Sequence, residues 1–141
     1  MRAAPSNKEI PTNRVVHFEV PSKDGARVSS FYSNVFGWNM QQMGAEMGDY
    51  ILATTTETDE QGMIKQPGAI NGGFFKHSDV PNAAPSVVIE VEDIRAHMKR
   101  VTDAGGEVIG EPQEIPGVGQ FVAFVDTEGN RLSMIQPPAH A

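Results

Sequence analysis

One histidine and two glutamates are the residues of this sequence whose types and spacing best suit chemistry. His17 and Glu19 are two positions apart, so in a β-strand their side chains would lie on the same face. Glu90 ends a second segment of similar pattern. An imidazole and carboxylates can bind a divalent cation, or they can exchange protons with a bound molecule. The sequence contains no cysteine, so thiolate ligands, a thiol nucleophile and disulfides are excluded.

The composition indicates a soluble globular protein. A chain of 141 residues fits one domain. The formal net charge is −7, and lysine and arginine are not clustered, which argues against nucleic-acid binding. The sequence has neither the apolar core of a secretory signal nor an apolar run long enough to span a membrane. We therefore expect a cytoplasmic protein with no nucleic-acid or membrane partner.

The residues around His17 predict a strand followed by a helix. Apolar residues alternate with His17 and Glu19 over residues 15–20, as in a strand with one packed face. From residue 26 the apolar spacing becomes helical, with Asp24 as the expected N-cap and Gly37 as the stop. Three further strands are expected at 38–43, 49–54 and 69–76, and the polar stretch 55–68 is the longest predicted loop.

The second half of the chain repeats this order. Ser86 follows His17 by 69 residues, and Gly106 follows Gly37 by the same number. Asp93 is the expected cap of the second helix, and strands are predicted at 107–115, 120–126 and 131–136. A fixed offset between like elements indicates an internal duplication. We therefore expect an α+β fold of two βαβββ modules, module one at 14–77 and module two at 85–137, within a domain spanning 14–137. Residues 1–13 form a polar arm and 138–141 a tail.

At this point the sequence resembles the vicinal oxygen chelate superfamily, which includes glyoxalase I, bleomycin-resistance proteins and extradiol dioxygenases. The resemblance rests on three segments in order: "HFEVPSKDGARVSSFYSNVFGW", "VVIEVEDIRAHMKRVTDAGGEV" and "FVAFVDTEGNRLSMIQP". Thr127 departs from the proline usual in the family's last turn. The resemblance implies that the paired modules form a half-open barrel whose concave face holds the site. It also implies a homodimer.

Metal-dependent members carry four ligands, one on the first and one on the last strand of each module. The matching positions here are His17, Gly72 or Gly73, Ser86 and Ser133. Glycine has no side chain to offer, and a neutral serine hydroxyl is a weak ligand. We therefore expect no metal cofactor and read His17 as a residue that lines the concave face. The alternative is a bound Ni, Mn, Fe or Zn ion with His17 as a ligand.

Two classes of function remain open. The first is metal-independent binding of a small molecule. Its expected ligand-binding residues are His17, Glu19, Ser86, Ser133, Trp38 and Phe75. The second is a metal-dependent glyoxalase-like lyase or isomerase, or a dioxygenase, with an altered metal site. In that case Glu19 and Glu90 would be the catalytic acid and base, unless each carboxylate faces solvent or pairs with a basic residue. The first class is favoured because three of the four ligand positions lack a suitable side chain.

Overall fold

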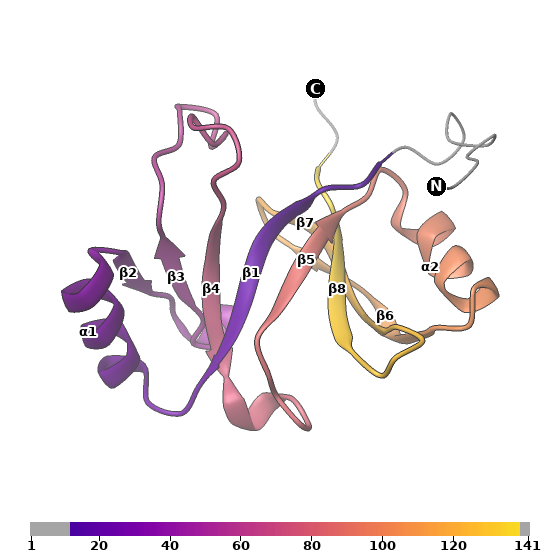
Figure 1. Ribbon diagram of the computed structural model, residues 1–141, viewed down its shortest axis with the longest axis horizontal. Coiled ribbons are helices and arrows are strands. Elements are labelled where there is room, and N and C mark those ends of the chain that lie inside the picture. Colours follow the sequence, from indigo (N-terminus) through magenta and orange to yellow (C-terminus); the bar gives the residue numbers. More distant parts are fainter. Residues whose placement is uncertain (1–11, 139–141) are drawn as a thin grey trace. The chain divides into compact units, whose positions relative to one another are not determined.

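The computed structural model describes residues 12–138, drawn in colour in Figure 1. Within this range the chain is α+β, and its strands and helices follow the order βαβββ twice. The chain divides into two compact units, Val16–Val88 and Ile89–Ala141 with Met1–Val15. Among residues 12–138, no helix is both long and apolar enough to cross a membrane. The elements are β1 Val15–Ser22, α1 Gly25–Phe36, β2 Asn39–Gln42, β3 Ile51–Thr54, β4 Asn71–Lys76, β5 Ser86–Glu90, α2 Ile94–Asp103, β6 Glu107–Ile115, β7 Gly119–Val125 and β8 Arg131–Gln136, with 3-10 turns at Ala45–Met47 and His77–Asp79.

The unit Val16–Val88 is built on four strands paired in the order β2-β3-β4-β1. β1 runs parallel to β4, whereas β2, β3 and β4 are antiparallel neighbours. Its core lies between these strands and α1. Ile51, Ala53 and Phe74 are buried there, and Phe18 and Val20 of β1 pack against them together with Val28 and Tyr32 of α1. The predicted alternation of β1 is therefore confirmed: its apolar face packs toward the helix.

Both ends of α1 follow from local chemistry. The Asp24 carboxylate accepts a hydrogen bond from the backbone N–H of Arg27 at 3.0 Å, which satisfies a donor of the first turn. The helix ends at Gly37, whose φ of 73° lies in the left-handed region that glycine adopts without strain. The predicted cap and stop are both confirmed.

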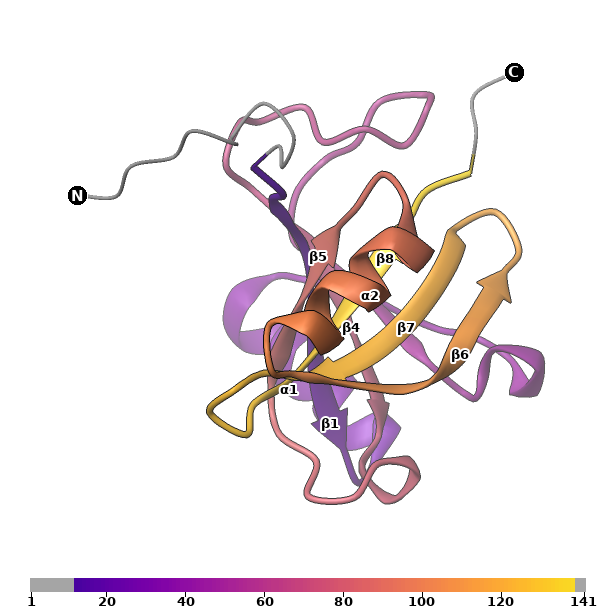
Figure 2. The same ribbon diagram turned by 90° about the vertical axis from the view of Figure 1, so that its right-hand side faces the viewer.

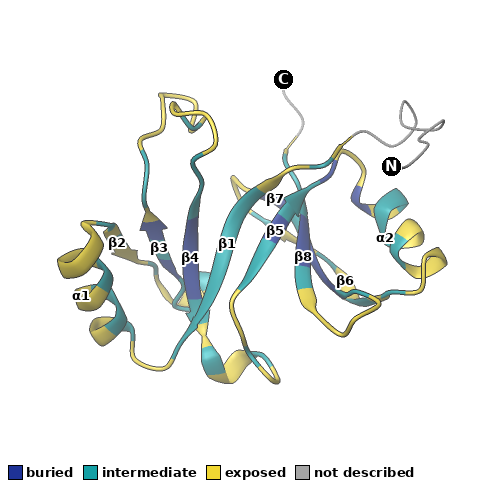
Figure 3. Cartoon of the chain, viewed as in Figure 1, coloured by how far each residue is buried: buried dark blue, intermediate teal, exposed yellow. Residues whose placement is uncertain are grey.

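The apolar stripe of α1 is only half used in packing. Tyr32 stacks on Trp38 with ring centroids 4.8 Å apart and contacts Phe74. Phe31, Val35 and Phe36, which belong to the same helical pattern, remain 53%, 55% and 59% exposed. Figure 3 shows this face of α1 as mostly exposed. The stripe is therefore wider than the surface that β3 and β4 offer to it.

The other unit has an antiparallel meander of β6, β7 and β8. Helix α2 lies across these strands, as Figure 2 shows. Val91, Ile94, Val122, Phe124 and Met134 form its buried core. Asp93 caps α2 by accepting a hydrogen bond from the Ala96 N–H at 3.1 Å, as predicted. The sequence prediction of the strands of this unit holds within one residue at each end.

The tight turn "DTEGN" joins β7 to β8. The Asp126 carboxylate accepts hydrogen bonds from the backbone N–H groups of Glu128 and Asn130. These bonds lower the pKa of the Asp126 carboxyl. Gly129 takes a φ of 85°, which a β-carbon would strain. The turn thus closes on its own side-chain and backbone contacts, with threonine at 127.

Candidate functional site

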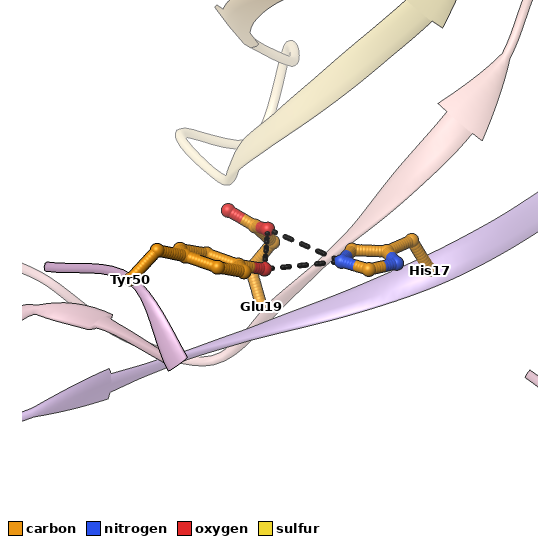
Figure 4. A network of polar contacts seen from close by, with 3 residues as sticks. All are labelled: His17, Glu19 and Tyr50. Carbon is orange, nitrogen blue, oxygen red and sulfur yellow. Dashed lines mark hydrogen bonds and ion pairs between the residues drawn. The ribbon is translucent and has the colours of Figure 1, made fainter. Parts of the chain in front are cut away.

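His17, Glu19 and Tyr50 form one polar network on the unit Val16–Val88 (Figure 4). The Tyr50 hydroxyl donates a hydrogen bond of 2.5 Å to Glu19 Oε2. His17 Nε2 lies 3.0 Å from the Tyr50 oxygen and 3.6 Å from Glu19 Oε2. The phenol therefore bridges the two residues that the sequence singles out for chemistry.

Strand register brings these three side chains together. His17 and Glu19 share a face of β1 because they are two residues apart. Glu19 pairs with Gly73 of β4, and Gly73 pairs in turn with Leu52 of β3. Tyr50 directly precedes β3. Because Ile51 is buried in the core beneath α1, alternation turns Tyr50 toward the other face of the strands.

Gly73 makes room for the Tyr50 ring. A β-carbon built at Gly73 would overlap the ring and hydroxyl of Tyr50. At the neighbouring Gly72 a β-carbon would instead overlap the Phe18 ring, on the core side of the strands. The two glycines of "NGGFF" therefore admit one aromatic ring on each face of β4. Glycine within a strand often marks such a close approach.

Burial shifts the pKa of all three groups toward their neutral forms. It lowers the pKa of the His17 imidazole. It raises the pKa of the Glu19 carboxyl, although the hydrogen bond from Tyr50 acts in the opposite direction. Burial also raises the pKa of the Tyr50 phenol, and the nearby charge of Glu19 raises it further. The phenol therefore keeps its proton and acts as a donor.

His17 and Glu19 lie close enough to form an ion pair, yet the two effects on His17 oppose each other. A carboxylate 3.6 Å away favours the imidazolium, whereas loss of hydration disfavours it. Loss of hydration lowers the pKa of the His17 imidazole. The His17 side chain is 30% exposed and that of Glu19 is 16% exposed, so the network meets solvent mainly at the histidine.

Metal-dependent members of the superfamily that the sequence resembles hold a divalent cation at the matching positions, and the residues present here do not fit one. A zinc-like ion would lie about 2.0–2.2 Å from its nitrogen and oxygen ligands. Between His17 and Glu19 that space is taken by the protonated hydroxyl of Tyr50. The next ligand position on β4 is a glycine, covered by the Tyr50 ring. Within residues 12–138, no group of three histidine, aspartate or glutamate side chains is placed to hold an ion.

Trp38, Ser86 and Phe75 line cavities whose walls do not include Tyr50. Trp38 and Ser86 line an apolar cavity of about 680 Å³ together with Phe18 and Tyr32. Phe75 lines a more polar cavity of about 600 Å³ beside Ser22 and Lys76. The linings of these two cavities include neither His17 nor Glu19. That these three residues contact a ligand stays a prediction.

Glu90 and Ser133 lie in the other unit of the chain, on β5 and β8. Glu90, at the end of β5, accepts a hydrogen bond from Arg14 Nε at 3.2 Å and is ion-paired with it. Pairing with a basic residue is one of the two alternatives to a catalytic role stated above for Glu90, and here that residue is Arg14. Ser133 lies on β8 opposite Ala123 and is 7% exposed.

Tyr50 is the site residue that sequence reasoning missed. It stands 31 residues from Glu19, just before a strand, and aromatic residues near strands are usually core. Two signals were present. Ile51 and Ala53 alternate with Tyr50 and Leu52, and a glycine occupies the ligand position of β4. A side-chain-free position beside Glu19 requires another residue to fill the space.

Residues 14–134 match the Glyoxalase/Bleomycin resistance protein/Dioxygenase superfamily. The chain belongs to this superfamily. The resemblance inferred from the three sequence segments, and the fold that it implied, are therefore confirmed.

Similar proteins include a glyoxylase-like domain-containing protein of Didymella fabae. It is 32% identical over 124 residues, which cover 85% of this chain and 91% of that protein. The anthracycline biosynthesis protein DnrV of Streptomyces peucetius is 30% identical over 130 residues. The match covers 79% of this chain and 42% of DnrV.

Among solved structures, methylmalonyl-CoA epimerase of Streptomyces coelicolor, with 2-nitronate-propionyl-CoA bound, has a TM-score of 0.66. The epimerase is 15% identical to this chain. The match covers 89% of this chain and 98% of the epimerase chain. At 15% identity this similarity shows the fold alone.

Proposed function

We propose that this superfamily member binds a small molecule at the face formed by His17, Glu19 and Tyr50, without a metal ion. One observation supports the proposal above others: the Tyr50 hydroxyl bridges the imidazole and the carboxylate at hydrogen-bond distance. A few fixed polar groups beside apolar surface suffice to orient a ligand. Solved structures of this fold carry coenzyme A esters, which is consistent with a small-molecule ligand here.

The alternative is a metal-dependent glyoxalase-like lyase or isomerase, or a dioxygenase, with an altered metal site. A metal enzyme of this kind needs at least three protein ligands and an open position for substrate. Here two candidate ligands are hydrogen-bonded to a phenol, and glycine stands at the next ligand position. We therefore place Glu19 in the network as a hydrogen-bond acceptor and derive no step through a cation.

A cytoplasmic homodimer completes the proposal. Phe31, Val35 and Phe36 of α1 are more than half exposed, and contiguous apolar side chains on a surface mark interaction sites. A second copy of the chain is the partner that the superfamily resemblance implies. The mass of the untagged protein in solution tests this part directly by light scattering.

The test of metal-independent binding combines elemental analysis with a fragment titration. The untagged protein is dialysed against Ni²⁺, Mn²⁺, Fe²⁺ or Zn²⁺, then against buffer, and its metal content is measured. In parallel, methylmalonyl-CoA, an anthracycline and a small-fragment library are titrated in EDTA. The backbone amide NMR signals of β1 are the readout in every variant, and the His17 side-chain signals are a second readout wherever His17 is present.

We expect less than one ion per chain and ligand-induced shifts of His17 in EDTA. His17→Ala should abolish binding, whereas His77→Ala, outside the network, should not. A stoichiometric ion that is lost in His17→Ala would overturn the proposal and favour the metal-dependent alternative. Binding that persists in His17→Ala would also contradict it.

A further inference from the structure

The hydrogen-bond directions within the network follow from the number of protons available. A phenol carries one hydroxyl proton, and an ionised carboxylate can only accept. Because the Tyr50 hydroxyl donates to Glu19, its proton is not available for His17. The contact of 3.0 Å between His17 Nε2 and the phenol oxygen is then a hydrogen bond only if Nε2 carries the proton.

The position of Glu19 favours the same arrangement. Its Oε2 atom lies 3.6 Å from His17 Nε2, so a proton on that nitrogen faces both the phenol oxygen and the carboxylate. A neutral imidazole with a proton on Nε2 has its lone pair on Nδ1. Within Val16–Val88, His17 Nδ1 has no hydrogen-bond partner, and Figure 4 shows it on the side of the ring away from Tyr50 and Glu19.

We propose that Tyr50 is a positioning residue, which holds His17 in the Nε2–H form and thereby presents Nδ1 as the acceptor for a hydrogen bond from the ligand. The inference rests on the proposed small-molecule function and names the class of ligand. That ligand carries an N–H or O–H donor, because the atom it meets can only accept. The group of the ligand that meets this nitrogen is uncharged or cationic, because the carboxylate of Glu19 lies beside the same imidazole and repels anions.

This arrangement gives the chain a use for Tyr50 that packing alone does not explain. The ring fills space left by Gly73, but phenylalanine would fill the same space. Only the hydroxyl connects the histidine to the carboxylate. The hydrogen bond that a histidine makes through one ring nitrogen sets which of the two nitrogens is protonated.

The first experiment reads the protonated nitrogen of His17 by long-range proton–nitrogen NMR at pH 8. We expect the Nε2–H form in the wild type. Tyr50→Phe removes the hydroxyl and should give a mixture of the two neutral forms. Tyr32→Phe is the matched control, because it is the same change at the other tyrosine, which belongs to α1 and packs against the core, and it should leave His17 unchanged.

The second experiment compares pairs of ligands. Each fragment found in the metal-free titration is tested against its O-methyl or N-methyl counterpart, which lacks the donor. We expect the methylated compound to bind about tenfold more weakly to the wild type, because the acceptor is left unpaired. Tyr50→Phe should reduce this preference, and Tyr32→Phe should not.

The outcomes distinguish failure of the positioning role of Tyr50 from failure of metal-free binding. A wild-type His17 with its proton on Nδ1, or equal affinity for both members of each pair, overturns the role of Tyr50 while metal-free binding stands. A stoichiometric ion lost in both His17→Ala and Tyr50→Phe overturns both, because the phenol would then be a metal ligand.

Discussion

The ring of Tyr50 lies over Gly73, so closely that a β-carbon on the glycine would overlap it. Gly73 is also the register partner of Glu19 on the neighbouring strand. The Tyr50 ring can therefore take its position only because residue 73 is a glycine.

Gly73→Ala should displace Tyr50 and lower the free energy of unfolding by about 1–3 kcal/mol, the usual cost of overpacking. In a Tyr50→Ala background the same change should cost much less, because the ring that it meets is gone. Urea denaturation of the four proteins gives the coupling energy between the two sites.

Gly72→Ala is the matched control for this cycle. Its β-carbon would meet Phe18 on the core face, so its cost should be the same with or without the Tyr50 ring. If Gly73→Ala and Tyr50→Ala prove additive, the packing of the ring over the glycine is contradicted.

The raised pKa of Glu19 predicts a pH-dependent stability. The unfolded chain loses this proton near pH 4.5, whereas the folded chain keeps it to higher pH. The resulting stabilisation is fully present below about pH 4.5 and is lost as the pH rises through the folded-state pKa. Glu19→Gln removes this dependence and still accepts a bond from Tyr50. The free energy of unfolding of the variant, relative to wild type, should therefore increase from pH 4.5 to pH 7.5.

Glu60→Gln is the comparison for this pH series, because Glu60 is exposed in the loop between β3 and β4. Its difference from the wild type should not follow the trend seen for Glu19→Gln. Denaturation curves at five pH values suffice. A difference between Glu19→Gln and wild type that stays constant with pH would show that burial does not raise the carboxyl pKa.

The fold was predictable because its signals are local and repeated. The change of apolar period at Ala26, the aspartate caps and the 69-residue offset each depend on a few neighbouring residues. Local preferences of this kind survive folding when the tertiary structure agrees with them. The strand ends differ by one or two residues because hydrogen bonding, rather than residue type, decides where a ladder stops.

The candidate site was predictable only in part. The alternation around His17 and Glu19 places them on one face, but nothing near them in the sequence points to Tyr50. That contact depends on the pairing of β3 with β4 and of β4 with β1, which joins residues 31 positions apart. The prediction that Trp38 and Phe75 contact a ligand depends on residue type alone, and it stays a prediction.

The two aspartate caps make a third prediction about stability. Asp24→Ala and Asp93→Ala should each lower the free energy of unfolding by about 1 kcal/mol, because each leaves an N–H of the first helical turn without its partner. Asp24→Asn and Asp93→Asn keep an acceptor oxygen and should cost less. Equal losses for alanine and asparagine would contradict a capping role.

The exposed stripe of α1 predicts where the proposed homodimer forms. Phe31 and Val35 are one helical turn apart and both are more than half exposed. Replacing both by aspartate introduces two charges into an apolar contact, so we expect light scattering to report a monomer. The control is Ser30→Asp with Asn34→Asp, which adds the same charges on exposed positions of the same helix, shifted one residue around it. A control that also dissociates would indicate repulsion between the helices in general. A dimer that survives the Phe31 and Val35 changes would place the interface elsewhere, and a monomeric wild type would remove the dimer from the proposal.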